Sequence, residues 1–447
     1  MIGRIDSNFY LPSTTGLSNS KFPITTLGEL SLRIIQPTEF TREYVEESEN
    51  SLPVLRAANI GDGELNLEDL IFIDKSKLQG AKDSFIERGD VLITRTGANA
   101  GETCVVRELS RQYVISSHSI RVLPKKDIVI PEFLEGALLS KFGKDQVNRL
   151  FTGAAQKQLQ LKSVATIQIP IPPLEAQLAL VADMESARLA RQEKLSQVSD
   201  LLKGMDVFVL EQLGLKLPKE EKKSTFAIRF NTVQDSRVDP HFHHPTFRKL
   251  IDVIQRVSYE ELGQLVKFSH EIWSPERETA EIFRYIEISG VNIQTGNITA
   301  IETPVSEAPS RARMMTRNGD ILISLTRPHR GAIAQVDKSF DSCIASTGFS
   351  IIREITDKRI TKDYLWCILR NQISLQQMLQ RSSGGNYPAI TEPELTKIII
   401  PIPSEKIQEK ITSELSHRRA QARALREEAE REWQSAKEKF EKALLNG

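Results

Sequence analysis

Three histidines in one short stretch are the residues with the clearest potential for metal chemistry. The stretch HFHH contains His241, His243 and His244, and imidazole nitrogens are common ligands of Zn²⁺. The surrounding frame, RVDPHFHHP from Arg237 to Pro245, is similar to RIDSNFYLP from Arg4 to Pro12, which holds no histidine. A ligand set should not vanish from one copy of a shared frame. We therefore expect these histidines to pack at the entry of a domain rather than to bind a metal.

The motifs that would carry catalysis are absent from the sequence. It contains no Gly-x-x-x-x-Gly-Lys-Ser/Thr phosphate loop, no Asn-Pro-Pro-Phe/Tyr motif for amino methylation, no Gly-x-Gly cofactor loop after a strand and no Gly-x-Ser-x-Gly nucleophile elbow. Its three cysteines, Cys104, Cys343 and Cys367, fit a reducing cytoplasm and form neither a zinc motif nor a disulfide framework. We expect a chain that is not an enzyme and holds no cofactor or metal.

Length and composition indicate a globular protein of more than one domain. A chain of 447 residues exceeds one ordinary core, and its 40% apolar and 26% charged residues are typical of soluble proteins. We find no apolar run that could span a membrane and no signal peptide, so we expect a cytoplasmic protein. Because 59 basic residues balance 59 acidic ones, any surface for nucleic acid must arise from local segregation of charge.

An internal repeat runs through the chain. TIQIPIPPLEAQ, from Thr166 to Gln177, matches KIIIPIPSEKIQ, from Lys397 to Gln408. GDVLITRTG, which starts at Gly89, matches GDILISLTR, which starts at Gly319. Further matches keep nearly the same offset, which is far too long for a solenoid. The chain is therefore predicted to contain two tandem copies of one unit.

Each copy has the pattern of a mixed α/β (α+β) domain followed by a long helix. β-Branched runs at 91–94, 119–123, 321–324 and 349–353 predict strands, and helical spacing predicts short helices near 130–150 and 363–381. Two later segments each predict a helix of about 40 residues, or roughly 60 Å. A long helix with one narrow apolar stripe needs a partner, so we expect the two to pair as an antiparallel coiled coil.

The predicted boundaries follow from these patterns. The first domain comprises 1–173, the first helix 174–215, a charged linker 216–224, the second domain 225–403 and the second helix 404–447. The predicted seam of the first helix comprises Leu174, Val181, Met184, Leu195, Val198, Leu202, Met205 and Val209, and meets Arg188 and Arg191. That of the second helix comprises Ile407, Ile411, Leu415, Ala422, Leu425, Ala429, Trp433, Ala436 and Phe440.

The duplicated order of these motifs resembles the specificity subunit of Type I restriction–modification systems. The resemblance rests on the GD-[VI]-L-I-[TS] strand, the IPIP step and the long helix, and it covers nearly the whole chain. It implies two target recognition domains that each read one half of a split, asymmetric double-stranded DNA target. It also implies that two adenine-methyltransferase (modification) subunits dock on the paired helices and that translocating endonuclease (restriction) subunits join them. S-adenosylmethionine, ATP and Mg²⁺ would then be held by those partners.

Basic and polar side chains in the loops where the two copies differ are the candidates for DNA contact. Such side chains can donate to phosphates and read base edges, although solvated loops are polar in any protein. Different loops on one scaffold are what two unlike half-sites would require. The candidates are Arg95, Thr96, Asn99, Gln156, Lys157 and Gln158 in the first domain, and Arg327, His329, Arg330, Asn386 and Tyr387 in the second.

Basic residues midway along each long helix form a second candidate surface. A solvated helix face is the simplest interpretation. The alternative is contact with non-specific DNA between the half-sites, or with an acidic surface of the methyltransferase subunits. These residues are Arg188, Arg191 and Lys194 in the first helix, and Arg418, Arg419, Arg423 and Arg426 in the second.

Two other functions fit the same sequence. The chain could be the recognition subunit of a Type IIB enzyme or of another methyltransferase-based defence complex, which neighbouring genes would distinguish. It could also be a coiled-coil scaffold with two protein-binding domains. Such a scaffold would show no salt-sensitive binding to DNA.

Overall fold

The structure is a computed structural model that describes residues 17, 20–40, 43–67, 69–78, 80–153, 157–218, 225–228 and 237–446. The frame from Arg4 to Pro12, the candidate Gln156 and most of the predicted linker lie outside the described residues. The chain divides into two compact units, and each takes a part of both long helices. Unit 1 is Met1–Leu195 with Arg426–Gly447, and unit 2 is Ser196–Leu425. The domain boundaries proposed from the sequence stay predictions.

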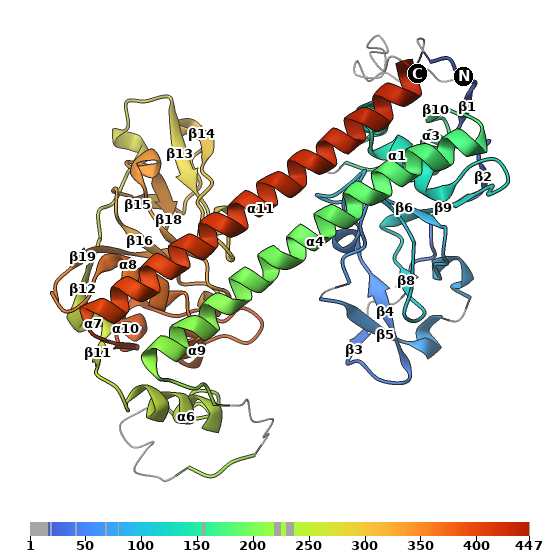
Figure 1. The fold of residues 1–447 in the computed structure, drawn as a ribbon. Helices are drawn as coiled ribbons and strands as arrows, with labels where there is room; N and C mark the ends of the chain where they lie inside the picture. Colours follow the sequence, from blue (N-terminus) through green and yellow to red (C-terminus); the bar gives the residue numbers. More distant parts are fainter. Residues whose placement is uncertain are drawn as a thin grey trace. The chain divides into compact units, whose positions relative to one another are not determined.

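Among its described residues, unit 1 contains two four-stranded sheets and three short helices besides its parts of the two long helices. The sheets and short helices are drawn mainly in blue to teal in Figure 1. The first sheet has the order β2-β9-β6-β7, with β2 at Ser31–Ile35, β9 at Ser119–Pro124, β6 at Val91–Thr94 and β7 at Thr103–Val105. The second has the order β3-β5-β4-β8, with β3 at Tyr44–Val45, β5 at Ile71–Asp74, β4 at Ser51–Leu55 and β8 at Val114–Ile115. A short antiparallel pair joins β1 (Ile24–Thr26) to β10 (Gln168–Pro170), and the helices are α1 (Pro131–Leu139), α2 (Lys141–Leu150) and α3 (Leu161–Val164).

Unit 2 repeats this plan. Its first sheet has the order β12-β19-β16-β17, with β12 at Val266–Phe268, β19 at Phe349–Ile355, β16 at Ile321–Ser324 and β17 at Ile333–Gln335. Its second has the order β14-β13-β18-β15, with β14 at Ile301–Pro304, β13 at Ile282–Ile286, β18 at Ile344–Ser346 and β15 at Ala312–Met315. β11 (Tyr259–Glu261) pairs with β20 (Ile399–Pro401). The helices are α6 (Pro245–Ile254), α7 (Leu262–Leu265), α8 (Lys362–Leu369), α9 (Gln372–Arg381) and α10 (Glu392–Leu395).

The β-branched runs form central strands because both of their faces are buried. In β6, Val91 and Ile93 pack into the core beneath α1, whereas Leu92 packs into a second core on the opposite face. In β16, Ile321 and Ile323 likewise face one core and Leu322 the other. Successive side chains of a strand point to opposite faces, so a continuous apolar run suits a strand covered on both sides. The four strands predicted from such runs are confirmed.

Each predicted short helical segment is divided in two by a capping residue. Ser140 ends α1, and its hydroxyl accepts a hydrogen bond from Gly143 N at 3.3 Å to begin α2. Asn371 separates α8 from α9 in the same way, because its side-chain oxygen accepts from Ile373 N at 3.1 Å. Ser and Asn side chains cap helix N-termini readily, so one helical region becomes two helices that meet at an angle.

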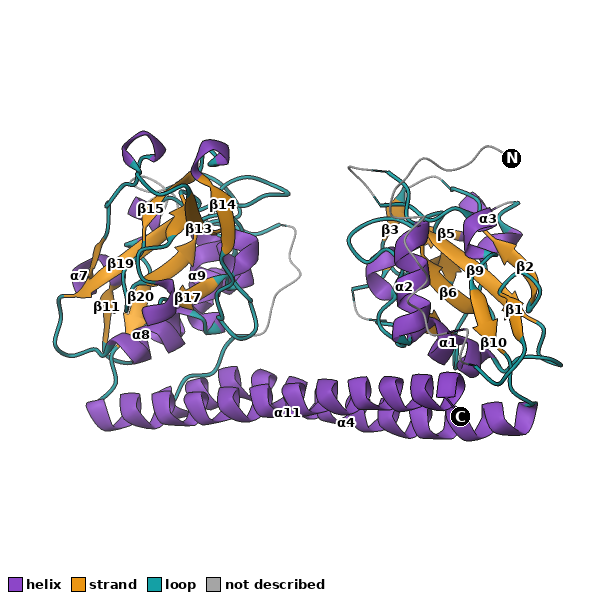
Figure 2. Cartoon of the chain, turned by 90° about the horizontal axis from the view of Figure 1, so that it is seen from above, coloured by secondary structure: helices purple, strands orange, loops and turns teal. Residues whose placement is uncertain are grey.

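Two long helices complete both units, and Figure 2 shows each as an unbroken purple ribbon. They are α4 (Leu174–Leu213, 40 residues) and α11 (Glu405–Asn446, 42 residues). Within unit 1 they run antiparallel, since Arg191 pairs with Glu430 at 3.2 Å and Lys194 pairs with Glu428 at 2.7 Å. The predicted antiparallel pairing is confirmed. No helix in the described part of the chain is long and apolar enough to cross a membrane.

The apolar seam of α4 is narrower than the sequence predicts. Val198 and Val209 are buried, but Leu195 is 36% exposed and Leu174 is 42% exposed, so placing these leucines in the seam was wrong. At the level of Leu195, the preceding Lys194 forms ion pairs with Glu428 and Glu432 of α11. The stripe of α11 agrees better with the prediction, because Ile411, Leu415, Ala422, Ala429, Trp433 and Phe440 are all buried.

A buried glutamine has the same structural role after each Pro-Ile-Pro stretch. In unit 1, Gln177 Oε1 accepts from Ile130 N at 2.9 Å, and Gln177 Nε2 donates to the Pro172 carbonyl at 2.9 Å. In unit 2, Gln408 accepts from Thr361 N at 3.0 Å and donates to the carbonyl of Pro403 at 3.0 Å. Buried polar backbone groups need such partners. Each glutamine therefore attaches the start of its long helix to the segment that begins α1 or α8.

Candidate nucleic-acid interface

The aspartate of the Gly-Asp motif anchors the strand that leads into the predicted DNA-contact loop of unit 1. Asp90 Oδ2 accepts hydrogen bonds from Glu87 N at 2.7 Å and from Arg121 Nε at 2.6 Å. Asp90 and Arg121 are both buried. A charge-assisted hydrogen bond between buried partners is stronger than a neutral one, so this pair fixes the start of β6 against β9.

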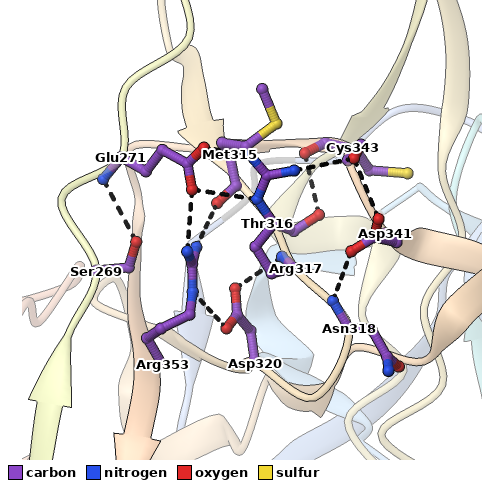
Figure 3. Close-up of polar contacts among 11 residues, drawn as sticks. Ser269, Glu271, Met315, Thr316, Arg317, Asn318, Asp320, Asp341, Cys343 and Arg353 are labelled. Carbon is purple, nitrogen blue, oxygen red and sulfur yellow. Dashed lines mark hydrogen bonds and ion pairs between the residues drawn. The ribbon is translucent and has the colours of Figure 1, made fainter.

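The same anchor stands at the start of β16 in unit 2, where it belongs to the larger network of Figure 3. Asp320 accepts from Arg317 N at 2.8 Å and from Arg353 Nε at 2.7 Å. Glu271 accepts from both guanidinium groups, at 2.9 Å from Arg353 Nη1. Hydrogen bonds from Arg317 and then Arg353 hold the pKa of Glu271 below its ordinary value. The network joins β16 and β19 to the segment that follows β12.

Replacement of Glu271 by glutamine is expected to destabilise unit 2 by about 0.5–1 kcal/mol at neutral pH, a small effect because Glu271 is partly exposed. A depressed carboxyl pKa gives stability that is present above the unfolded value and is lost as the pH falls through the folded value. The difference between variant and wild type should therefore shrink below the ordinary pKa of 4.5. Urea unfolding at pH 7, 5 and 4 measures it.

The matched control is Glu307→Gln, because Glu307 is exposed and has no ion-pair partner among the described residues. This variant should unfold like the wild type at every pH. A Glu271→Gln effect of equal size at all three pH values would contradict a role for the ionised carboxylate.

In unit 1 the two predicted DNA-contact segments lie side by side. Thr96 and Gln158 pair in an antiparallel β-bridge. Arg95 Nε donates to the Ser117 carbonyl at 3.1 Å, and the Thr96 hydroxyl lies 2.7 Å from His118 Nδ1. The structure thus brings Arg95, Thr96 and Gln158 together and adds His118, which the sequence-based set omits. His118 lies in the repeated SSHSIRVL segment, so a closer comparison of the copies could have identified it.

The predicted residues of unit 1 differ in how far they are available for contact. Thr96 is buried, so its hydroxyl shapes the loop. Asn99 and Lys157 are exposed, and Lys157 Nζ lies 5.4 Å from the centre of the Phe151 ring. Exposed amide and ammonium groups are the donors that phosphates and base edges accept. Contact with DNA by these side chains stays a prediction.

In unit 2 an exposed aromatic ring supports the predicted arginine. Thr326 pairs with Ala389 in a β-bridge that corresponds to the one in unit 1. The Arg327 guanidinium lies 4.1 Å from the centre of the Tyr387 ring and donates to the Asn386 carbonyl at 3.1 Å. Tyr387 is 70% exposed. A guanidinium stacked on a ring is held in one orientation while its other donors stay free.

The other two candidates of this loop lie in the 3₁₀ turn Pro328–Arg330, which follows the left-handed backbone of Arg327 (φ 48°). Burial, and then the charges of Arg330 and Arg327, lower the pKa of His329, so its imidazole is neutral at pH 7. Its Nδ1 atom is buried and has no hydrogen-bond partner among the described residues. Arg330 is exposed. Unit 2 therefore presents Arg327, which is stacked on Tyr387, and Arg330, which is exposed to solvent. This set of side chains differs from the set in the loops of unit 1.

The basic residues of α4 are already engaged in ion pairs within unit 1. Arg188 is buried and pairs with Glu64 at 2.9 Å. Arg191 pairs with Glu430, and Lys194 lies 2.6 Å from Glu432 as well as near Glu428. These ion pairs give the three basic residues a structural role within unit 1. A DNA or subunit contact by them stays untested.

The basic residues of α11 fall into two classes. Arg418 pairs with Glu414 at 2.7 Å, and the Arg419 guanidinium lies 4.1 Å from the centre of the Trp366 ring. Arg426 is half-buried. Arg423 is exposed and has no ion pair among the described residues. Of these four arginines, Arg423 alone is exposed.

The three clustered histidines have separate packing partners. His244 caps α6, and its Nδ1 accepts from Thr246 N at 3.4 Å. His241 Nε2 lies 3.2 Å from the Leu379 carbonyl, and His243 hydrogen-bonds the Arg237 carbonyl. No group of three His, Cys, Asp or Glu side chains within the described ranges could hold a metal ion. The expectation that these residues pack at the entry of a domain stays a prediction.

Comparison with known protein families identifies the scaffold. Residues 25–186 and 285–428 match the model of the family described as Type I restriction modification DNA specificity domain. The chain belongs to this family. Each specificity-domain match includes one Gly-Asp anchor and one pair of bridged loops.

Individual relatives match parts of this specificity-domain protein. The EcoBI specificity subunit of Escherichia coli is 28% identical over 162 residues, which cover 36% of this chain and 32% of that protein. The HindI specificity subunit of Haemophilus influenzae is 29% identical over 109 residues, or 24% of each chain. The matched segments thus span a third or less of these relatives. A chain from a structure of a type I R-M system is 19% identical, covers 95% of this chain and 98% of that chain, and has a TM-score of 0.45.

Proposed function

We propose that this chain is the DNA sequence-specificity subunit of a Type I restriction–modification complex and reads a bipartite, asymmetric double-stranded target. The observation that carries the proposal is a repeated scaffold with unlike loops. Both units hold their candidate loops with a Gly-Asp anchor and a β-bridge. On that common base, Arg95 of unit 1 donates to the Ser117 carbonyl and Thr96 contacts His118, whereas unit 2 presents Arg327 on Tyr387. One reader for each half-site is the simplest use of such a design.

The proposal includes the partners that the family resemblance implies. Two adenine-methyltransferase subunits would dock on α4 and α11, and translocating restriction subunits would join them in the cytoplasm. Those subunits would bind S-adenosylmethionine, ATP and Mg²⁺ and would carry the methylation and cleavage steps. The chain itself would supply sequence recognition.

Loss of two arginines in unit 2 is expected to affect one half-site only. Replacing Arg327 and Arg330 by alanine should blur or weaken the second half-site, because a good base-edge contact contributes about 1–3 kcal/mol. The reciprocal variant Arg95→Ala should affect only the first half-site. Mapping of modified bases in a host that carries each variant with the methyltransferase subunit measures both effects. Equal change of both half-sites in either variant would contradict two independent readers.

The purified chain is expected to have no methyltransferase or nuclease activity by itself. Incubation with labelled S-adenosylmethionine and DNA, and separately with Mg²⁺ and supercoiled plasmid, tests this expectation. The control adds the methyltransferase subunit, which should restore labelling of the DNA. Stoichiometric labelling by the chain alone would overturn the assignment of catalysis to the partners.

A further inference from the structure

Arg188 on α4 and Arg419 on α11 occupy corresponding positions of the repeat. Arg188 follows the buried Gln177 by eleven residues, and Arg419 follows the buried Gln408 by the same number. Both glutamines make the same hydrogen bonds at the start of their helices. The two arginines can therefore be compared directly, each within its own unit.

In unit 1 the positive charge of Arg188 is paired with carboxylates. Arg188 pairs with Glu64 at 2.9 Å and with Glu185, three residues earlier on the helix, at 2.5 Å. The hydrogen bond with Glu185 contributes most to holding the pKa of Arg188 above its ordinary value. Glu135 on α1 adds a third carboxylate, which pairs with Arg107 at 2.6 Å. Every charge of this cluster has a partner from the same unit.

In unit 2 none of the three carboxylates is present. Ser416 stands three residues before Arg419, where unit 1 has Glu185. Trp366 stands five residues before the capping Asn371, as Glu135 stands five before Ser140. Asn297 precedes Ile298 of the bridge Val291–Ile298, as Glu64 precedes Leu65 of the bridge Ile60–Leu65. Unit 2 thus has an arginine at this position, as unit 1 does, but neutral residues where unit 1 has the three glutamates.

Two donors at this position have no acceptor. The Arg419 guanidinium lies 4.1 Å from the centre of the Trp366 ring, and its Nη1 lies 3.8 Å from Cys367 Sγ. Arg419 Nε and Trp366 Nε1 are both buried without a hydrogen-bond partner among the described residues. Leaving a buried donor unsatisfied is costly. Both residues are nevertheless only half-buried as a whole, so part of each side chain lies at the surface.

A second arginine adds positive charge on the same tryptophan. The Arg370 guanidinium lies 5.5 Å from the centre of the Trp366 ring and donates to the carbonyls of Ile333 at 2.6 Å and Gln294 at 2.8 Å. Burial and then the charge of Arg419 lower the pKa of Arg370 to about 10. The nearby Asp206 accepts a hydrogen bond from Asn371 Nδ2 at 2.8 Å. Neither guanidinium has an ion-pair partner in the described part of unit 2.

We propose that the unpaired donors of Trp366 and Arg419, with the positive charge of Arg370 beside them, bind a carboxylate side chain of a protein partner; the three residues are here called the Arg-Trp-Arg site. Unit 1 fills the equivalent position with glutamates, and Arg and Trp are the residues that dominate protein–protein contacts. A carboxylate ends a flexible side chain and can reach recessed donors, whereas a phosphodiester carries a sugar on either side. The choice of the methyltransferase subunit as that partner rests on the proposed function.

Three variants test the site, with calorimetric titration of the methyltransferase subunit into the full chain as the measurement. Arg419→Gln removes the charge. Ser416→Glu places a carboxylate where Glu185 stands in unit 1. The new side chain should pair with Arg419 and so compete with the carboxylate of the partner. Lys410→Gln is the control, because Lys410 is an exposed cation of the same helix that belongs to neither candidate contact surface. The first two variants should bind the subunit at least about tenfold more weakly, and the control should bind like wild type.

The thermal stability of Ser416→Glu separates lost binding from misfolding, because an internal ion pair should leave the melting temperature unchanged or raise it. Binding of the subunit within about twofold of wild type by both variants would overturn the inference. So would a loss of affinity for DNA alone in Arg419→Gln, since the ligand would then be a phosphate. Failure of the wild type to bind the subunit would also overturn it, whereas the proposed function is tested separately by the modified-base pattern in the host.

Discussion

Replacement of Trp433 by alanine is expected to lower the free energy of unfolding of unit 1 by about 3–5 kcal/mol. Trp433 lies on α11 and is 1% exposed, within the core formed by α1, α2 and β6. Its Nε1 donates to Asp62 Oδ2 at 2.8 Å, across 371 residues of sequence. The variant therefore loses a large buried ring and one of the two hydrogen bonds that Asp62 Oδ2 accepts.

Asp62 links α11 to α2 as well as accepting from Trp433. Its carboxylate also accepts from Lys437 Nζ at 2.8 Å and from Lys144 Nζ at 3.0 Å. Burial alone would raise the pKa of Asp62, but the hydrogen bond from Lys437 and the charge of Lys144 outweigh it and lower the pKa. The last part of the chain thus stabilises the first recognition domain, so removal of residues 426–447 should have an even larger effect than the single substitution.

Hydrogen exchange followed by mass spectrometry measures the effect unit by unit. Amides of β6, β9 and α1 should exchange faster in Trp433→Ala, whereas those of β16 and β19 should keep their rates. Gln434→Ala, at the next position on the exposed side of α11, is the control and should change neither unit. Equal acceleration in both units would show that the chain unfolds as one body and that Trp433 has no special role in unit 1.

Lengthening both long helices is expected to lengthen the DNA target. Four residues added after Leu195 in α4 and after Leu425 in α11 lie where each helix passes from one unit to the other. They extend each helix by about 6 Å and rotate it by roughly 40° beyond one full turn, so the apolar faces should still meet. Since one base pair advances DNA by about 3.4 Å, the non-specific spacer should grow by about one or two base pairs, while both half-sites stay the same.

The control for this experiment is an insertion into α4 alone. It leaves the unit 1 pairs Arg191–Glu430 and Lys194–Glu428 in place but shifts the rest of α4 by four residues against α11, where Arg418 lies over the Phe208 ring, so this variant should lose activity rather than change its spacer. An active double-insertion variant with an unchanged spacer would mean that something other than these helices sets the distance between half-sites.

Features that depend on local pattern were predictable from the sequence. The runs at Val91–Thr94 and Ile321–Ser324 form strands because apolar residues on both faces suit burial between two cores. The long helices follow from stretches nearly free of Gly and Pro with regular apolar spacing. The repeat itself placed the candidate loops at equivalent positions, and the β-bridges of Thr96 and Thr326 confirm that equivalence.

Features that depend on partners distant in sequence were not predictable. The apolar spacing predicts that Leu195 faces the other long helix. In the structure it is Lys194 that contacts α11 at this point, because it pairs with Glu428 and Glu432. The sequence pattern predicts that Arg188 lies on a solvated helix face. In the structure its side chain is buried and pairs with Glu64 and Glu185. A periodic pattern identifies one face of a helix and carries no information about which charges the facing element supplies.

The most direct test of two-reader recognition is the mapping of modified bases in a host that carries this chain with its methyltransferase subunit. The account predicts methylated adenines in an asymmetric motif of two short sequences separated by a spacer of fixed length and free sequence. A hybrid in which the bridged loops of unit 2 are taken from another family member should change one of those sequences and keep the other. A single continuous motif, or modification without sequence preference, would contradict the account.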